Sequence, residues 1–140
     1  MRWKARRPRW ELKDGKYQQV LLERHVVKEI VERLWYQAKI KVKVINQPYA
    51  GKTPQNVSGI PDLVGWIPRK LLLPLPDSGV SRAIPVYIEV KRPGGVRRPA
   101  QILFIEEARA DGCVAFFAES WADVMREMNE QVGLKLKEGL

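Results

Sequence analysis

The chain has 140 residues and a formal net charge of +9, from 25 lysines and arginines against 16 aspartates and glutamates. This length suits one domain with its own hydrophobic core, and the charge favours binding to polyanions such as nucleic acid. No run approaches the roughly 18 consecutive apolar residues of a membrane span, so we expect a cytoplasmic protein that does not bind membranes. One histidine and one cysteine are too few for a zinc site, a Cys-His nucleophile pair or an internal disulfide. Carboxylates, lysines and an added metal ion remain for catalysis.

Residues 1–13 are predicted to form a basic arm, and residues 14–140 a single folded domain. The first ten residues contain Trp3 and Trp10 among arginines and lysines, a composition too charged to fold by itself. Such an arm can lie along phosphates and stack an indole on a base. A solvated tail whose tryptophans dock on the domain or on a partner subunit explains the composition equally well.

A helix is predicted from Asp14, as its cap, to about Gln37, because apolar residues recur there at helical spacing. These residues are Val20, Val26, Val27, Ile30, Val31, Leu34 and Trp35. Its spacing to Val26, Val27, Ile30 and Leu34 predicts Glu23 in the centre of this apolar stripe, where a carboxylate needs a cation or hydrogen bonds. We therefore consider Glu23 a candidate site residue. The alternatives are a salt bridge, or a place at the end of the stripe where the side chain reaches water.

Two strands are predicted next, separated by a polar loop over residues 46–58. Residues 40–45 alternate apolar residues with lysines, as expected for a half-buried edge strand whose lysines face solvent or DNA. Asp62 follows a Gly-x-Pro turn and precedes the apolar run 63–67. Its carboxylate should therefore lie at the start of the second strand, at the rim of the sheet. A turn-capping role is the alternative for Asp62.

A long, proline-containing connection over residues 68–82 leads to a third strand, Ile84–Lys91. Alternate side chains of a strand share a face, so Glu89 and Lys91 lie on one side with Tyr87. The opposite side of this strand is wholly apolar. The pattern thus places an acid beside an amine, and a solvated sheet face is the alternative explanation.

The remaining chain is predicted to form a helix, a buried strand and a second helix. The first helix begins at Pro99 and reaches about Asp111, and residues 113–118 form the strand. The second helix runs from Ser120 to about Val132. A strand, a helix and a strand in succession favour parallel pairing, so we predict an α/β fold whose mixed sheet carries helices on both faces, in the order α-β-β-β-α-β-α.

Gln101 shares the inward face of the first of these helices with Ile105 and Ala108, near the end of the strand that carries Glu89. It is a candidate to steady an attacking water or a phosphate oxygen. On spacing alone, a hydrogen bond to another side chain or a cap of the first helical turn is favoured. Three arginines close to Lys91 in the sequence are candidate DNA contacts: Arg92, Arg97 and Arg98.

Together, Asp62, Glu89 and Lys91 suggest a metal-dependent phosphodiesterase. Oxygen ligands from Asp62, Glu89 and the backbone carbonyl of Val90 suit Mg²⁺ or Mn²⁺, which can acidify a water and neutralise charge on a phosphate. Lys91 would deprotonate or position that water, or stabilise the developing charge. Glu23 would hold a metal-bound water or a second ion.

The succession Glu23, Gly59-Ile60-Pro61-Asp62, Glu89-Val90-Lys91 and Gln101 resembles the VRR-NUC branch (virus-type replication-repair nuclease) of the PD-(D/E)XK superfamily. The resemblance spans roughly residues 20–120. It implies a restriction-endonuclease-like fold and Mg²⁺- or Mn²⁺-dependent cleavage of DNA phosphodiesters. The implied catalytic core is Asp62, Glu89 and Lys91, supported by Glu23 and Gln101.

Stand-alone members of that branch, which are common in bacteriophages and then act in the host cytoplasm, are implied to be homodimers that cut four-way junctions. The leading hypothesis is therefore a dimeric, structure-selective DNA endonuclease that resolves Holliday junctions in DNA repair, because two sites related by a twofold axis match the symmetry of a junction. The alternatives are a flap endonuclease or nickase with a single site, and a DNA-binding protein without catalysis. The connection 68–82 and the Arg- and Trp-rich arm depart from the usual family pattern.

Overall fold

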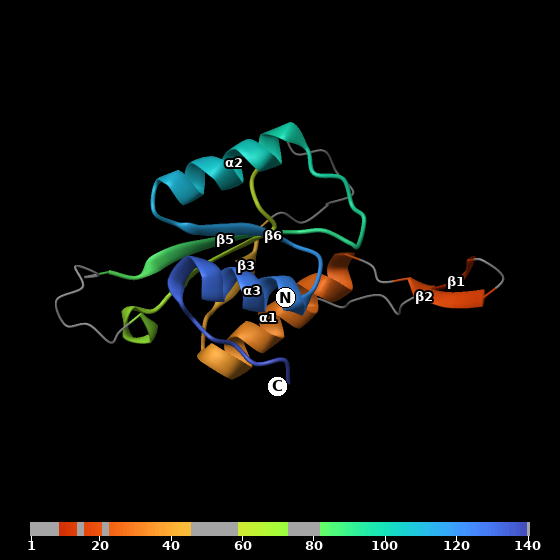
Figure 1. Cartoon of the computed structure of the whole chain (residues 1–140), viewed down its shortest axis with the longest axis horizontal. Coiled ribbons are helices and arrows are strands. Elements are labelled where there is room, and N and C mark those ends of the chain that lie inside the picture. The colour runs from red at the N-terminus through yellow and green to blue at the C-terminus, as the bar shows by residue number, and fades with distance from the viewer. Residues whose placement is uncertain (1–8, 14–15, 21–22, 46–58, 73–81, 140) are drawn as a thin grey trace.

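A computed structural model describes residues 9–13, 16–20, 23–45, 59–72 and 82–139 (Figure 1). In chain order the elements are β1 (Arg9–Lys13), β2 (Lys16–Val20), α1 (Glu23–Ala38), β3 (Val42–Val44), β4 (Leu63–Ile67), the short 3-10 helix η1 (Arg69–Leu71), β5 (Ile84–Val90), α2 (Pro99–Ala110), β6 (Val114–Ala118) and α3 (Trp121–Val132). From α1 onward, helices and sheet strands follow the order α-β-β-β-α-β-α. The predicted α/β fold is confirmed, and it is consistent with the restriction-endonuclease-like architecture.

Four strands form one mixed sheet in the order β3-β4-β5-β6. Strand β4 runs antiparallel to both β3 and β5, whereas β5 and β6 are parallel and are connected through α2. The antiparallel register pairs Leu63 with Ile88. Continued by one residue, this register sets Asp62 beside Glu89, so the pairing of two strands brings the predicted acids together.

Helices cover the sheet on both faces, with α1 and α3 on one side and α2 on the other (Figure 1). The larger core lies between the sheet and the pair α1 and α3; it includes Ile30, Leu34, Leu63, Ile88 and Phe116, each with no exposed surface. A smaller core under α2 is made by Ile105, Ala108 and Ala115, with Tyr87 and Phe104 packed against it. Strand β6 contributes to both cores, which explains why its sequence is a continuous apolar run.

The predicted start of the first helix is wrong. Helix α1 begins at Glu23, and Lys16–Val20 forms strand β2, which pairs with β1 in a separate two-stranded antiparallel sheet. The hairpin extends from the end of the molecule where α1 begins (Figure 1). Lys13 pairs with Lys16, which leaves a two-residue connection whose sequence, Asp14-Gly15, is the dipeptide most typical of such hairpins. Asp14 and residues 1–8 lie outside the described part of the chain, and the division into an arm over residues 1–13 and a domain over 14–140 stays a prediction.

The apolar stripe of α1 is narrower than predicted. Val26, Val27, Ile30 and Leu34 are buried, whereas Trp35 is 46% exposed. Trp35 follows Leu34 directly, and one residue turns a helix by about 100°, which carries the indole away from the core.

The end of the chain packs back on α1 and α3. Helix α3 ends at Gly133, whose φ of 68° suits a glycine, and Leu134 and Leu136 then pack against the larger core. The side chain of Gln37 donates to the carbonyl of Lys137 at 2.6 Å and accepts from its backbone N–H at 2.7 Å. Within the described residues, no helix is long and apolar enough to span a membrane.

Candidate active site

The candidate site lies at the end of the sheet where β5 and β6 finish and where α1 and α2 begin (Figure 1). The strand register and the two helix N-termini bring together side chains from four parts of the sequence. They are Glu23 from α1, Asp62 from the turn before β4, Glu89 and Lys91 from the end of β5, and Gln101 from α2.

Asp62 is held by backbone on both of its neighbouring strands. Its Oδ2 accepts a hydrogen bond from the backbone N–H of Val90 at 3.0 Å, and its backbone carbonyl accepts from the N–H of Ile45 at 2.9 Å. The preceding Pro61 is fully buried. The carboxylate is therefore fixed at the rim of the sheet, as predicted, and its contact with β5 goes beyond a cap of its own turn.

The Gly-x-Pro-Asp turn owes its position to Gly59. The residue has a φ of +96°, and a Cβ at this position would lie 2.8 Å from the carbonyl oxygen of Ala100 in the first turn of α2. Glycine thus allows two backbones to meet where any other residue would clash. This contact between the turn that carries Asp62 and the helix that carries Gln101 leaves no signal in the local sequence pattern.

Glu89 is the most enclosed acid of the site, with only 3% of its surface exposed. Its Oε1 accepts from the side-chain Nε2 of Gln101 at 2.9 Å and lies 3.5 Å from the Nζ of Lys91. Its Oε2 is buried and receives no N–H donor from the described residues. A buried carboxylate oxygen without a partner is costly, so this atom calls for a proton or a cation.

The two carboxyls of Asp62 and Glu89 are close enough to interact strongly. Burial, followed by the negative charge of Asp62, raises the pKa of Glu89 to about 8, against the opposing effect of Lys91. Burial also raises the pKa of Asp62, although the Val90 amide, Glu89 and Lys91 oppose the shift. Two adjacent buried carboxyls retain a proton between them unless a positive charge replaces it.

Glu23 is the first residue of α1 and is half-buried, so it lies at the end of the apolar stripe and not in its centre. Its carboxyl is nevertheless part of the same electrostatic cluster. Burial and then the charge of Asp62 raise the pKa of Glu23, while Lys91 and Arg92 lower it.

Lys91 is only 8% exposed, which is unusual for a lysine. It follows the last residue of β5, and its backbone N–H donates to the carbonyl of Ala118 at 2.9 Å, which extends the pairing with β6. A buried ammonium requires a partner, and the carboxylate of Glu89 provides one. The acid and the amine are therefore enclosed and paired, unlike those of a solvated sheet face.

Gln101 makes the two contacts given as alternatives to a catalytic role, a hydrogen bond to another side chain and a cap of the first helical turn, while its contact with a water or phosphate stays a prediction. Its Nε2 donates to Glu89, and its Oε1 accepts from the backbone N–H of Arg98 at 3.0 Å, which caps the start of α2. One side chain thus ties the N-terminus of a helix to the buried carboxylate, and this leaves the orientation of Glu89 little freedom.

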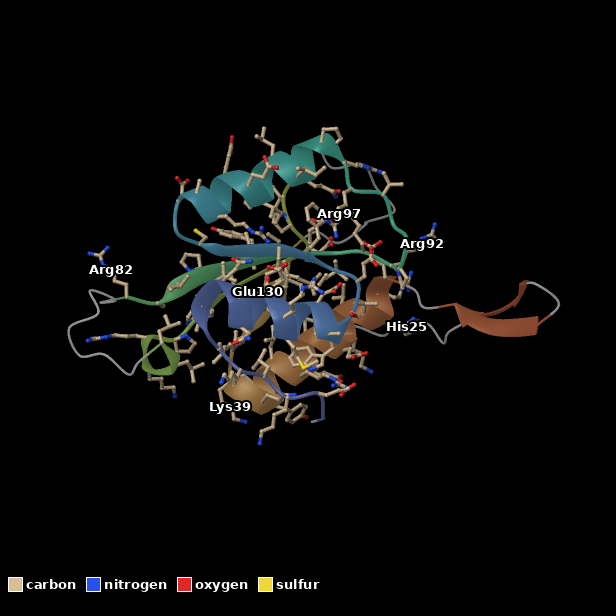
Figure 2. All side chains as sticks on the ribbon, in the orientation of Figure 1. His25, Lys39, Arg82, Arg92, Arg97 and Glu130 are labelled. Carbon is tan, nitrogen blue, oxygen red and sulfur yellow. The ribbon has the colours of Figure 1, made fainter. Side chains whose placement is uncertain are left out.

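The three arginines have different surroundings. Arg92 points outward at the end of the sheet near the start of α1 (Figure 2). The guanidinium of Arg97 lies 4.5 Å from the ring centroid of Phe117, the residue paired with Glu89 across the parallel strands. Arg98 precedes α2 as its N-cap residue. All three are exposed, and their assignment as DNA contacts stays a prediction.

The residues present fit a small divalent cation. Within the described ranges, no three or more His, Cys, Asp or Glu side chains are grouped to hold a metal ion. The predicted ligands include only two acids, Asp62 and Glu89, and the part of the Val90 carbonyl stays a prediction. Mg²⁺ commonly uses only one or two carboxylates and keeps several waters. The unpartnered Oε2 of Glu89 and the shared negative charge of the pair are what such an ion would satisfy.

Comparison with protein families matches residues 4–122 of the 140-residue chain to the VRR-NUC domain. Neither the curated proteins nor the solved structures yield a match to the chain. The matched residues include every side chain of the site described above, from Glu23 to Gln101. The chain therefore belongs to the VRR-NUC family, whose domain is a nuclease that acts on DNA.

Proposed function

We propose that this protein is a divalent-metal-dependent, structure-selective DNA endonuclease that acts as a homodimer and resolves Holliday junctions. The single observation that supports catalysis best is the buried Glu89, paired with Lys91 and adjacent to Asp62, with one oxygen left without a donor. A surface that only bound DNA would have no need to bury two acids and an amine, because burying charged groups is costly.

Asp62, Glu89 and the Val90 carbonyl would hold Mg²⁺ or Mn²⁺. When bound, the ion would supply a water of lowered pKa and would balance negative charge on the phosphate. The ammonium of Lys91 donates hydrogen bonds to the attacking water or to a phosphate oxygen on the exposed side of the cluster. Gln101 keeps the Glu89 carboxylate in place. Glu23, whose charge interacts with Asp62 and Lys91, would hold a metal-bound water or a second ion.

The junction specificity rests on symmetry and charge. Two copies related by a twofold axis would present two sites to a four-way junction, whose strands are related in the same way. The net charge of +9 on each chain supports contact with several DNA arms at once.

The test is incubation of the protein with a labelled four-way junction, a flap and a linear duplex, with Mg²⁺, with Mn²⁺ and with a chelator. Paired incisions at symmetric positions of the junction, only when an ion is present, support the proposal. Products from a single arm would support a flap nuclease or nickase instead, and binding without any incision would leave a non-catalytic DNA-binding protein.

A further inference from the structure

Among the described residues, helix α2 packs mainly on one half of its side of the sheet. It packs on β5 and β6, where it meets Tyr87 and Ala115, while β3 and β4 form the other half of the sheet. On this second half, Trp66 of β4 is 51% exposed. An exposed indole offers a large flat apolar surface and an N–H donor to a binding partner.

Strand alternation places Trp66 on the same face as the active site. Leu63 and Ile67 point into the larger core, so Asp62, Val64 and Trp66 point to the other side of β4. Asp62 and Trp66 are four residues apart, which at the usual rise of a strand is about 13 Å. The exposed indole is thus continuous with the site along one strand.

Two lysines of the neighbouring strand β3 lie beside this line of residues on β4. Lys43 pairs with Val64 across β3 and β4, and continuation of the register sets Lys41 opposite Trp66. Both lysines are exposed. Gly65 permits the close strand pairing, because a Cβ there would lie 2.3 Å from the carbonyl oxygen of Lys41. We call Lys41, Lys43 and Trp66 the β3–β4 strip.

The indole of Trp66 differs from the other tryptophans whose side chains are described. Lys39 lies 5.1 Å from the ring of Trp35, and Arg33 lies 5.6 Å from the ring of Trp121. No aromatic ring or cation among the described residues stacks on Trp66. Trp66 pairs with Pro85 of β5 on one side and lies opposite the exposed Lys41 on the other.

We infer that the β3–β4 strip binds a DNA strand next to the cleavage site, with Lys41 and Lys43 on its phosphates and Trp66 stacked on an unpaired base. This inference rests on the proposed function and adds a substrate feature to it. Lysines beside an indole favour a nucleic acid over an apolar protein surface. Inside a duplex the base faces are already stacked on one another, so the strip selects DNA that offers an unpaired base near the scissile bond.

The test compares the binding of a forked DNA with a single-stranded arm and a fully paired duplex of the same length, in chelator so that neither is cut. The variant Trp66→Ala should weaken binding to the fork by about tenfold or more and binding to the duplex by less than about threefold, and Trp66→Phe should restore most of the loss. Lys41→Ala and Lys43→Ala should weaken binding to both DNAs and should each lower the salt dependence by about one unit of slope.

The matched control is Trp35→Ala. Trp35 is also an exposed tryptophan beside a lysine, but it lies near the end of α1 marked by Lys39, far from α2 (Figure 2). Its loss should leave both affinities unchanged. The inference is overturned if Trp66→Ala affects binding to the two DNAs equally or affects neither. It is also overturned if light scattering shows that the wild-type protein is a dimer and that Trp66→Ala is a monomer.

The inference and the proposed function can fail separately. If the wild-type protein cuts junctions with Mg²⁺ but Trp66→Ala binds the fork normally, only the strip is wrong. If binding to the fork depends on Trp66 but no DNA is cut with any divalent ion, the strip stands as a binding site and the nuclease proposal falls.

Discussion

The two faces of β5 serve different purposes although they share one backbone. The face toward α1 and α3 carries Val86, Ile88 and Val90, all fully buried in the larger core. The face toward α2 carries Glu89, and Lys91 follows at the end of the strand. Glu89 is nearly as buried as the apolar residues of the first face, so burial on the first side stabilises the fold whereas burial of Glu89 on the second has a cost that function must justify.

The largest expected effect comes from neutralising the charged face. Asp62→Asn and Lys91→Ala should each reduce junction incision by about a thousandfold or more, because each removes a charged side chain that would help to stabilise the transition state. Affinity for the junction should stay within about tenfold, since phosphate contacts elsewhere dominate binding. Gel assays of incision and of binding test this, with the exposed Lys28→Ala as the control. A parallel loss of binding and incision would contradict these roles.

The apolar face should respond in the opposite way. Ile88 is fully buried, so Ile88→Ala should lower the free energy of unfolding by about 2–5 kcal/mol through lost contacts and a cavity. Incision per folded molecule should change little. Urea denaturation measures the free energy of unfolding, and a single-turnover assay at low temperature measures incision per folded molecule. A large loss of incision at unchanged stability would show that the two faces of β5 are not independent.

The buried acids predict an unusual dependence of stability on pH. Because the pKa of Glu89 is about 8 in the folded protein and near 4.5 when exposed, the folded state binds its proton more tightly. The metal-free protein should therefore be most stable at low pH on account of this group, and should lose stability of the order of a few kcal/mol as the pH rises through 8.

Thermal unfolding in chelator between pH 5 and pH 9 measures this loss. Glu89→Gln should remove most of it, whereas Glu130→Gln, at an exposed position of α3, should not (Figure 2). Addition of Mg²⁺ should restore stability at high pH, because the ion replaces the missing proton. A wild-type profile that follows Glu89→Gln would contradict the shifted pKa.

A smaller effect is expected at Gln101, which joins the helix N-terminus to the acid. Gln101→Ala should reduce incision by about 10–100-fold by releasing Glu89, and should cost about 1 kcal/mol of stability through loss of the cap. The control is a thermal melt of the same sample. A loss of stability without a loss of incision would reduce Gln101 to a helix cap.

Strand alternation and the order of the elements could be predicted because both follow from local patterns. The apolar alternation of β5 correctly placed Glu89 and Lys91 on one face, and the strand-helix-strand unit predicted the parallel pair β5 and β6. The meeting of Asp62 with Glu89 depends on the antiparallel pairing of β4 with β5, which these local patterns did not predict.

Other features depend on contacts that local patterns do not contain. Asp14-Gly15 suits a hairpin as well as a helix cap, and only the pairing of β1 with β2 distinguishes them. The contact of Gly59 with Ala100 joins residues far apart in the sequence, and the exposure of Trp66 depends on where α2 packs. The stacking of Arg97 on Phe117 likewise could not be predicted without knowledge of the fold.

The central claim is that Asp62 and Glu89 share one divalent ion at the edge of the sheet. The most direct measurement is anomalous diffraction from crystals soaked in Mn²⁺ at about pH 8, near the pKa of Glu89, where the ion can displace the proton of the carboxyl pair. We predict an anomalous peak within bonding distance of both carboxylates, and its absence in Glu89→Gln crystals. A wild-type map without a peak at this pair, or with one held by other residues, would contradict the account.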